Sequence, residues 1–296
     1  MNRRQFAKKS LLTSAFLSSL PLTGFMNTGQ ERYIKKGIMW GSIGVGETIE
    51  EKFMASKQAG FDGIEPMSHL SREEVLAARD KTGLKIPSVC GALHGRYPLS
   101  DPDPSIRQQG VDALRHTIED ASIYGADTVL LVPGRVNADV SYDHCWNRSI
   151  AEIRKVIPYA ERLNIIIAIE NVWNNFLLSP LEAALYVDQF ESPNVRFYFD
   201  CGNILVYGWP EQWIRILGKR IAKVHIKEYS MKLAESEGRR AGFRVDLMDG
   251  DVNWTAVMKA LDATGYSDWA IIEQSGGDTV NGLADLSRRL TEILRS

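Results

Sequence analysis

The chain has 296 residues, with 35 Lys and Arg, 37 Asp and Glu, and 44% hydrophobic residues, a composition that excludes an intrinsically disordered chain. The net charge of −2 argues against a nucleic-acid-binding protein, which usually carries a strongly basic face. Three cysteines without a C-x-x-C pair exclude a disulfide scaffold and a zinc-finger framework.

The pattern of residues 1–30 predicts a signal peptide, which would not belong to the folded domain. Four basic residues and no acidic residue are followed by a weakly apolar stretch over residues 11–25. That stretch is too short and too polar for a membrane-spanning helix, and the layout is that of an export signal. Residues 3–8, which begin with Arg3-Arg4, resemble a twin-arginine signal. We therefore expect an exported, periplasmic protein.

A basic disordered tail is the alternative interpretation of residues 1–30, and it would leave the protein in the cytoplasm. The leader contains no cysteine, so we expect no lipid anchor and no stable membrane attachment. Without the leader, 31 basic and 37 acidic residues remain, which is a net charge of −6.

Eight apolar or β-branched runs in residues 31–296 predict strands, and helical patterns separate them. Most of these runs are continuously apolar, as expected for a parallel sheet that is buried on both faces. Eight strand–helix units in about 265 residues match the usual size of a (β/α)₈ barrel. We therefore predict the α/β class and a single TIM barrel over residues 31–296. The eight predicted strands are Ile34–Trp40, Gly63–Pro66, Ile86–Ala92, Thr128–Val132, Ile165–Glu170, Val195–Asp200, Ala222–Ile226 and Trp269–Glu273.

Two of the helical patterns carry recognisable end signals. Ser71 stands three residues before Glu74, which is the spacing of an N-terminal capping box. A later apolar stripe from Val111 to Ala121 is followed by Gly125, a residue type that often ends a helix. These signals predict a helix that starts near Ser71 and another that ends near Gly125.

Polar residues close several of the predicted strands, and in a barrel these ends meet at the C-terminal mouth where active sites are built. A lone carboxylate there is often a helix cap, and a lone histidine is often a core residue. Glu170, Asp200, His225 and Glu273 close four successive strands. The three acids among them repel one another unless a proton or a cation lies between them. Carboxylates with one imidazole suit Mn²⁺, Mg²⁺, Co²⁺ or Zn²⁺. The residues are Glu65, Glu170, Asp200, His225 with Lys227, and Glu273.

The chain resembles the xylose isomerase-like barrel superfamily of sugar isomerases and epimerases over essentially all of residues 31–296. Within it, the sequence is most similar to L-ribulose-5-phosphate (L-xylulose-5-phosphate) 3-epimerases. The resembling segments are dispersed over most strands, which makes the match more specific than any single motif. They are residues 60–65, 86–90, 94–99, 107–110, 168–171, 197–203, 224–228 and 272–273.

This resemblance implies roles for particular residues. In the family, residues that match Glu170, Asp200, His225 and Glu273 bind one divalent metal ion, and those that match Glu170 and Glu273 are also the catalytic acid and base. To invert C3 of a ketose through an enediolate, one carboxylate removes the C3 proton and the other returns a proton on the opposite face. The implied activity is therefore metal-dependent ketose 3-epimerisation.

Further residues are candidates for substrate binding, and the alternative for each is a structural role. They are Glu65, His94, Arg96, Asn203 and Lys227. At Asn203, epimerases of free ketoses often carry histidine, whereas the phosphate-sugar branch has asparagine. A polar insertion from Ser230 to Asp246 holds three arginines and is interpreted either as a lid that binds a phosphate or as a solvated loop.

The substrate is expected to be a small sugar or sugar phosphate. Export favours a free sugar, a sugar acid or a cyclitol, because phosphorylated sugars are mainly cytoplasmic. Two alternatives share the metal site, an inosose dehydratase and a hydroxypyruvate isomerase, and a third is a non-catalytic sugar-binding protein. We expect no nucleic-acid partner, and a homodimer is possible because dimers are common in this superfamily.

Overall fold

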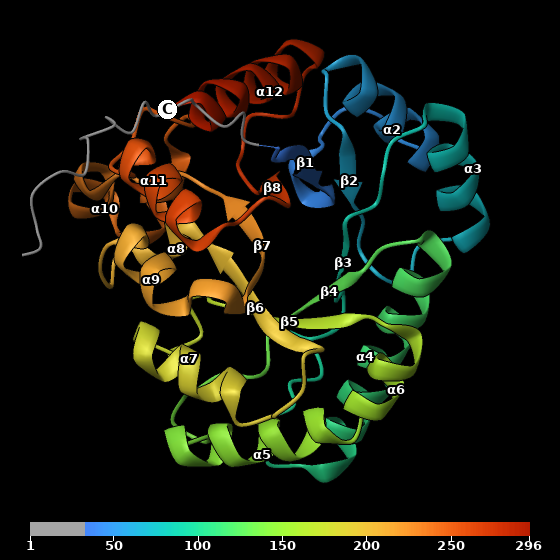
Figure 1. Cartoon of the computed structure of the whole chain (residues 1–296), viewed down its shortest axis with the longest axis vertical. Coiled ribbons are helices and arrows are strands. Elements are labelled where there is room, and N and C mark those ends of the chain that lie inside the picture. The colour runs from blue at the N-terminus through green and yellow to red at the C-terminus, as the bar shows by residue number, and fades with distance from the viewer. Residues whose placement is uncertain (1–32) are drawn as a thin grey trace, which may run out of the picture. The chain divides into compact units, whose positions relative to one another are not determined.

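The structure is a computed structural model that describes residues 33–296, and the predicted leader lies outside the described residues. Within this part, strands and helices alternate along the chain (Figure 1). The strands are β1 (Lys35–Met39), β2 (Gly63–Glu65), β3 (Ser88–Cys90), β4 (Thr128–Leu131), β5 (Ile166–Glu170), β6 (Val195–Asp200), β7 (Ile221–Ile226) and β8 (Trp269–Ile272). The α-helices are α2 (Ile49–Gln58), α3 (Arg72–Thr82), α4 (Pro104–Tyr124), α5 (Tyr142–Arg154), α6 (Ile157–Leu163), α7 (Pro180–Asp188), α8 (Cys201–Ile204), α9 (Pro210–Leu217), α10 (Met231–Glu237), α11 (Trp254–Thr264) and α12 (Val280–Arg295). Three 3-10 helices are η1 (Trp40–Ser42), η2 (Gly218–Arg220) and η3 (Arg239–Arg244).

The eight strands form one parallel sheet in the order β2-β1-β8-β7-β6-β5-β4-β3. The two end strands approach each other, because Ile64 N donates to Lys85 O and Cys90 N donates to Pro66 O, both at 2.9 Å. The sheet is thus a nearly closed barrel with helices around it (Figure 1). This arrangement matches the predicted (β/α)₈ barrel. None of the helices within residues 33–296 combines the length and apolar character needed to cross a membrane.

The local signals explain most element boundaries. All eight predicted strands are confirmed, and their ends differ from the prediction by at most two residues. Ser71 caps α3 by accepting a hydrogen bond from Glu74 N, and Gly125 ends α4 with a left-handed φ of 75°. The reciprocal capping box is made elsewhere, by Thr48 and Glu51 at the start of α2. Short-range capping therefore sets where these helices start and stop.

The core has two parts, as expected for a barrel. A large cluster lies between the outward face of the sheet and the helices, and includes Ile38, Val129 and Ile272. A smaller cluster fills the barrel interior with side chains from six strands. Its buried members are Cys90, Leu130, Ala168, Tyr198, Ala222, Trp269 and Ile271. The interior is therefore a packed core and not an open channel.

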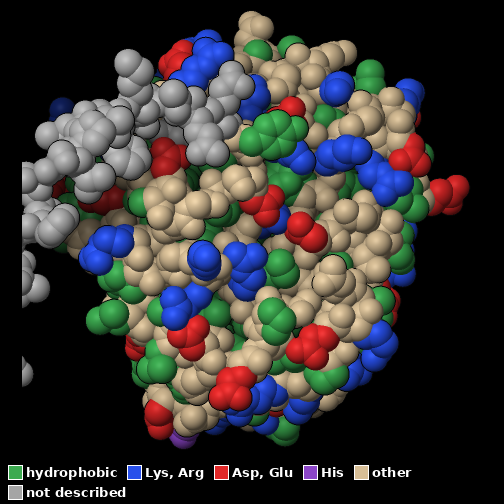
Figure 2. Space-filling model, viewed as in Figure 1, with side chains coloured by type: hydrophobic (Ala, Val, Ile, Leu, Met, Phe, Trp, Pro, Cys, Tyr) green, Lys and Arg blue, Asp and Glu red, His purple; other side chains and the backbone are tan. Residues whose placement is uncertain are grey.

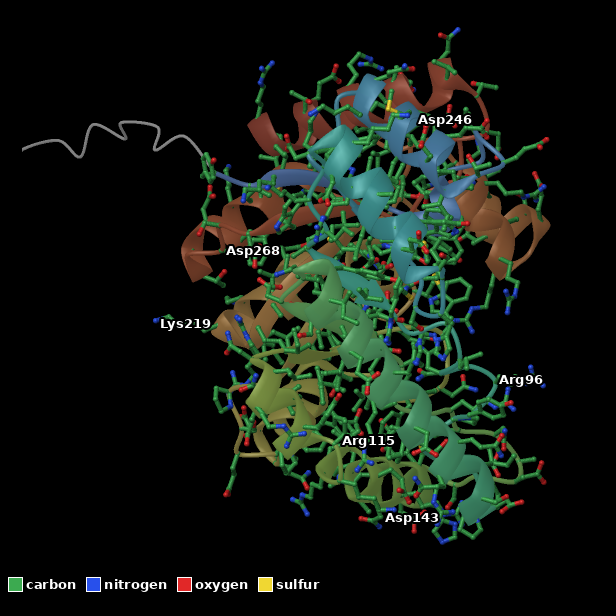
Figure 3. All side chains as sticks on the ribbon, turned by 90° about the vertical axis from the view of Figure 1, so that its right-hand side faces the viewer. Arg96, Arg115, Asp143, Lys219, Asp246 and Asp268 are labelled. Atoms are coloured by element: carbon green, nitrogen blue, oxygen red, sulfur yellow. The ribbon has the colours of Figure 1, made fainter. Side chains whose placement is uncertain are left out.

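The two ends of the barrel are distinguished in Figure 3. Arg96 and Asp246, which follow β3 and β7, lie on one side of the barrel, and Lys219 and Asp268, which precede β7 and β8, lie on the other. The first side is the C-terminal mouth, where sites of this fold are built. On the face of the molecule seen in Figure 1, basic and acidic side chains are interspersed (Figure 2).

Candidate metal centre

Four polar side chains from neighbouring strands meet at the C-terminal mouth. Glu170 and Asp200 are the last residues of β5 and β6, His225 is the last but one of β7, and Glu273 directly follows β8. One donor atom of each residue lies within 4.8 Å of the other three. The parallel register places Asp200 opposite His225, so the barrel itself brings the group together.

His225 is at the centre of this cluster. Its Nδ1 lies 3.0 Å from Glu170 Oε1 and 3.3 Å from Glu273 Oε2, and its Nε2 lies 2.8 Å from Glu65 Oε2. The histidine is 1% exposed, which leaves no solvent to separate these charges. Two carboxylate oxygens facing one imidazole nitrogen require a proton or a cation between them.

Lys227 balances part of the negative charge. Its Nζ donates to Glu273 Oε2 at 2.8 Å and lies 3.6 Å from Asp200 Oδ2. The second distance is an ion-pair distance and is too long for a hydrogen bond. Asp200 Oδ2 is buried and accepts no hydrogen bond from any residue of the described part. This carboxylate oxygen is thus available to a cation.

The local fields shift the pKa values of the carboxyl groups in different directions. Burial raises the pKa of Asp200 to about 8, although the Lys227 ammonium opposes this shift. Burial also raises the pKa of Glu170, against the hydrogen bond from His225. Burial acts in the same sense on Glu273, but Lys227 and His225 outweigh it and hold the pKa of Glu273 well below its usual range. Glu170 and Glu273 therefore differ in proton affinity, although both are glutamates.

The backbone around Asp200 is fixed by two asparagines. Asp200 Oδ1 accepts from Asn203 N at 2.7 Å, and Asn171 bonds to both the N–H and the C=O of Asp200. Asn203 Nδ2 in turn donates to Asn171 O at 3.0 Å. Gly202 is needed here because a Cβ at this position would lie 2.7 Å from Lys227 O. These contacts leave Asp200 Oδ2 pointing at the cluster.

The donor set fits a divalent metal ion. Three carboxylates and one imidazole are ligands that Mn²⁺, Mg²⁺, Co²⁺ and Zn²⁺ accept, and all four side chains are at least partly buried. The unbonded Asp200 Oδ2 and the repelling groups around His225 Nδ1 are the features that a cation would satisfy. A metal centre is therefore the chemistry that the arrangement accommodates best.

The candidates for substrate binding lie in different surroundings. Asn203 is buried beside Asp200, and Lys227 lies within the cluster. His94 is partly buried after β3, where its Nδ1 faces Val132 N at 3.4 Å. Arg96 is exposed at the edge of the mouth side (Figure 3), and its guanidinium lies 5.3 Å from the Tyr97 ring. Glu65 is completely buried beneath His225, a place that favours orienting this ring over touching a substrate.

The insertion after β7 is more ordered than its polar sequence indicated, because it contains α10 and η3. Arg239 lies 5.0 Å from the Trp173 ring, and its Nη2 donates to Tyr207 Oη at 3.2 Å. Arg244 pairs with Glu237 at 2.5 Å within the insertion. Arg239 thus packs on aromatic residues of the mouth, whereas Arg244 forms an ion pair within the insertion.

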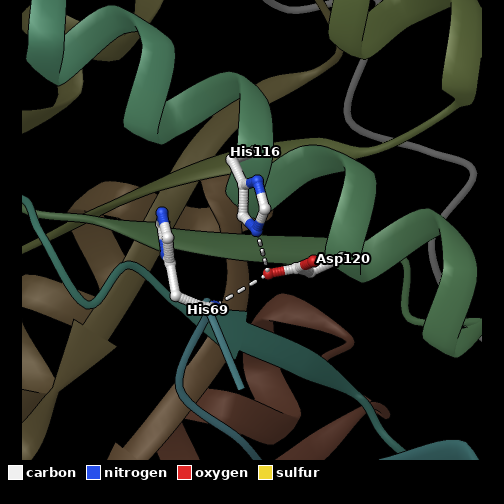
Figure 4. A group of neighbouring side chains, drawn as sticks. All are labelled: His69, His116 and Asp120. Carbon is white, nitrogen blue, oxygen red and sulfur yellow. Dashed lines mark hydrogen bonds and ion pairs between the residues drawn. The ribbon is translucent and has the colours of Figure 1, made fainter. Parts of the chain in front are cut away.

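A second group of metal-ligand residue types lies away from this centre, and consists of His69, His116 and Asp120 (Figure 4). The two imidazole rings are stacked, with centroids 4.1 Å apart and an angle of 22° between them. Because lone pairs lie in the ring planes, nearly parallel stacked rings cannot both point at one ion. Asp120 also accepts from Arg72 Nε at 2.6 Å and from His69 N at 2.9 Å. The group is better suited to anchoring the β2–α3 loop on α4.

Sequence reasoning missed several polar residues around the centre, namely Ser88, Asn171, Tyr198 and Gln274. Gln274 accepts from Glu228 N and donates to the carbonyl oxygens of Phe243 and Val245 in the insertion. A usable signal existed for Tyr198, because it stands two residues before Asp200 and side chains two apart on a strand share one face.

Comparisons with known proteins bear on the family and the fold of this chain. A family model described as a xylose isomerase-like TIM barrel matches residues 53–295. L-ribulose-5-phosphate 3-epimerase UlaE of Escherichia coli O1:K1 / APEC is 27% identical over 261 residues, which are 82% of this chain and 87% of that protein. The apo structure of 3-keto-D-glucoside 4-epimerase YcjR from E. coli has a TM-score of 0.74 and 19% identity, and covers 89% of this chain and 100% of its own. A structure of L-ribulose 3-epimerase has a TM-score of 0.70 and 23% identity, with coverages of 87% and 86%. These two likenesses concern the fold.

Proposed function

Because this chain belongs to the family of xylose isomerase-like TIM barrels, we propose that it is a metal-dependent isomerase that inverts C3 of a ketose. The observation that carries the proposal is the meeting of Glu170, Asp200, His225 and Glu273 at one point of the barrel mouth. The similarity to a 3-epimerase over most of the chain supports the same reaction class.

The strand order supports an acid/base pair. Glu170 ends β5 and Glu273 directly follows β8, and Asp200 and His225 come from the two strands between them. The two glutamates therefore flank the cluster, so that one removes the C3 proton and the other returns a proton from the opposite side. A divalent ion held by the cluster would stabilise the negative charge of the enediolate that lies between these two proton transfers.

Deuterium incorporation from D₂O into a panel of free and phosphorylated ketoses tests this proposal. With the full chain and added Mn²⁺, we expect exchange at C3 of at least one ketose. Glu273→Gln should lose it by ~10²-fold or more, since a proton-transferring group is removed. Glu292→Gln, an exposed pair with Arg288 on α12, is the matched control. Absence of exchange with every sugar by metal-loaded protein would favour a dehydratase or a binding protein.

We further propose that the substrate carries no phosphate group. Barrels that bind phosphate often use backbone N–H groups after strands 7 and 8. Here, Met248 N and Val252 N donate to Glu228, and Asp251 N donates to Tyr229 O. These amides are thus already bonded, which supports a free sugar, a sugar acid or a cyclitol. Robust turnover of L-ribulose 5-phosphate without activity on free ketoses would contradict this proposal.

Export through a twin-arginine signal is the second argument for a free sugar, and we propose a periplasmic location. Cell fractionation of the full chain, produced in a bacterium with this export route, tests it. The wild-type chain should appear in the periplasm, and a double Arg3→Lys, Arg4→Lys variant should remain in the cytoplasm. Equal distribution of both chains would contradict a role of the arginine pair.

A further inference from the structure

Glu65 is a fully buried acid next to the metal centre, and two hydroxyl groups hold it. It is the last residue of β2 and is 0% exposed. Its Oε1 accepts from Ser88 Oγ at 2.6 Å and from Tyr198 Oη at 2.8 Å. Both donors are also 0% exposed and belong to strands, so the carboxylate cannot turn freely.

The other oxygen of this carboxylate faces the histidine of the metal centre. Glu65 Oε2 lies 2.8 Å from His225 Nε2. Carboxylates face both ring nitrogens of His225. With an ion in place of the proton on Nδ1, the hydrogen of a neutral His225 would lie on Nε2, where Glu65 accepts it. Nδ1 is the nitrogen that faces Glu170 and Glu273. Glu65 thus gives the Nε2 hydrogen a buried acceptor, and Nδ1 is left as the nitrogen that would hold an ion.

We propose that Glu65, held by Ser88 and Tyr198, is a positioning residue that fixes the orientation and tautomer of His225 for metal binding. The inference rests on the metal site of the proposed function, and it adds residues that do not touch the ion. Ligand histidines commonly donate their second N–H to a carboxylate, which raises the basicity of the ligand nitrogen.

The packing of Tyr198 argues for a specific arrangement. Its ring lies 4.5 Å from the His225 ring at an angle of 55°, so that one side chain both supports the histidine and bonds to the acid that orients it. With Oε1 bonded to two hydroxyl groups, Oε2 is left for the imidazole. A buried carboxylate is costly unless such partners are present, so this network must be complete to persist.

Binding of Zn²⁺ alone to the full chain tests the inference by competition with a fluorescent chelator. We expect Glu65→Gln to weaken Zn²⁺ binding about 10–100-fold and Tyr198→Phe to weaken it less. Tyr124→Phe is the matched control, because Tyr124 Oη is buried and has no hydrogen-bond partner in the described part. This variant also removes a buried tyrosine hydroxyl group, but one that lies outside the metal centre. It should therefore bind Zn²⁺ like the wild type.

A spectroscopic readout separates orientation from general damage. In ¹⁵N-labelled, Zn²⁺-loaded wild type, we expect the His225 proton on Nε2, with slow exchange against water. In Tyr198→Phe and Glu65→Gln, this proton should exchange faster, whereas thermal unfolding in a chelator verifies that each variant is folded. Equal affinity and an unchanged ring signal in both variants would overturn this inference alone. A wild type that binds no Zn²⁺ would overturn the metal site and the inference together.

Discussion

Lys227 illustrates how charge is balanced at the level of single residues. Its Nζ lies 2.8 Å from Glu273 Oε2 and 5.0 Å from the centroid of the Phe243 ring. The pKa of Lys227 is raised, because Asp200 and Glu273 outweigh its burial. A cation in the cluster would compete with Lys227 for Glu273.

His94 provides a prediction about pH at the same scale. Burial lowers the pKa of His94 to about 4, against an opposing effect of Glu273. An unfolded histidine has a pKa of about 6.5, so between these values the unfolded chain binds more protons. Stability should therefore fall as the pH drops from about 6.5 towards 4, with about 2 kcal/mol of the free energy of unfolding lost at pH 5.

Urea unfolding of wild type and His94→Gln at pH 7 and pH 5 measures this contribution. The variant should lose less stability between the two pH values, by about the amount that His94 contributes. His144→Gln, on α5, is the control for removing a histidine elsewhere. If His94→Gln and wild type lose equal stability, the acid sensitivity belongs to other groups.

At the level of elements, the segment between the insertion and α11 is held by one buried acid, Glu228. Both oxygens of Glu228 accept two hydrogen bonds each, from Tyr229 N and Val252 N and from Met248 N and Trp254 Nε1, at 2.8–3.1 Å. The segment that returns to α11 is thereby tied to the end of β7. A glycine is required at position 250 because a Cβ there would lie 2.6 Å from Glu228 Oε1.

Removal of this acid should loosen the whole segment. Glu228→Ala leaves several buried N–H groups without an acceptor, and we expect a loss of roughly 3 kcal/mol or more in the free energy of unfolding. Urea unfolding measures this loss, and hydrogen exchange over residues 246–254 should become faster. Glu235→Ala, on the exposed part of α10, should change stability by less than about 0.5 kcal/mol. Equal effects of both variants would contradict the role of Glu228.

At the scale of the whole barrel, the two ends differ in how completely their buried charged groups are paired. At the N-terminal end, Lys223 is 1% exposed and pairs with Asp268 at 2.7 Å and Asp127 at 2.9 Å, so that the local charges are satisfied. At the mouth, Asp200 Oδ2 is buried and accepts no hydrogen bond from the described residues. The mouth is therefore the end where a cation should stabilise the folded barrel.

Metal should consequently raise the thermal stability of the entire chain. An ion at 100 times its Kd stabilises a folded protein by about 2.7 kcal/mol, which corresponds to a rise in Tm of about 5 °C or more at this size. Calorimetry with Mn²⁺ and with a chelator measures this shift, and Asp200→Asn should reduce it strongly. A shift that persists in Asp200→Asn but disappears in His116→Ala would assign the ion to the stacked histidine group.

Much of the architecture was accessible from the sequence. The continuous apolar runs predicted all eight strands, and the polar residues that close them predicted the group around His225, because parallel strands place their C-terminal ends together. The helices of the insertion, α10 and η3, were not predicted, since its polar composition lacks a strong apolar period. Glu65 stays a predicted candidate for substrate binding, and its hydrogen bonds to Ser88 and Tyr198 could not be predicted from the sequence.

Sequence alone determined the strands, the helix caps and the acids at the mouth, because these depend on residues a few positions apart. Tertiary structure decided the partners of those acids. Glu65 meets His225 across 160 positions, and Ser88 and Tyr198 join them only when strands from different parts of the chain share the barrel interior. Because these groups are buried, no water can replace a missing hydrogen-bond partner. Each group therefore depends on the particular residue that faces it. Such partnerships depend on closure and register of the barrel, which no local pattern contains.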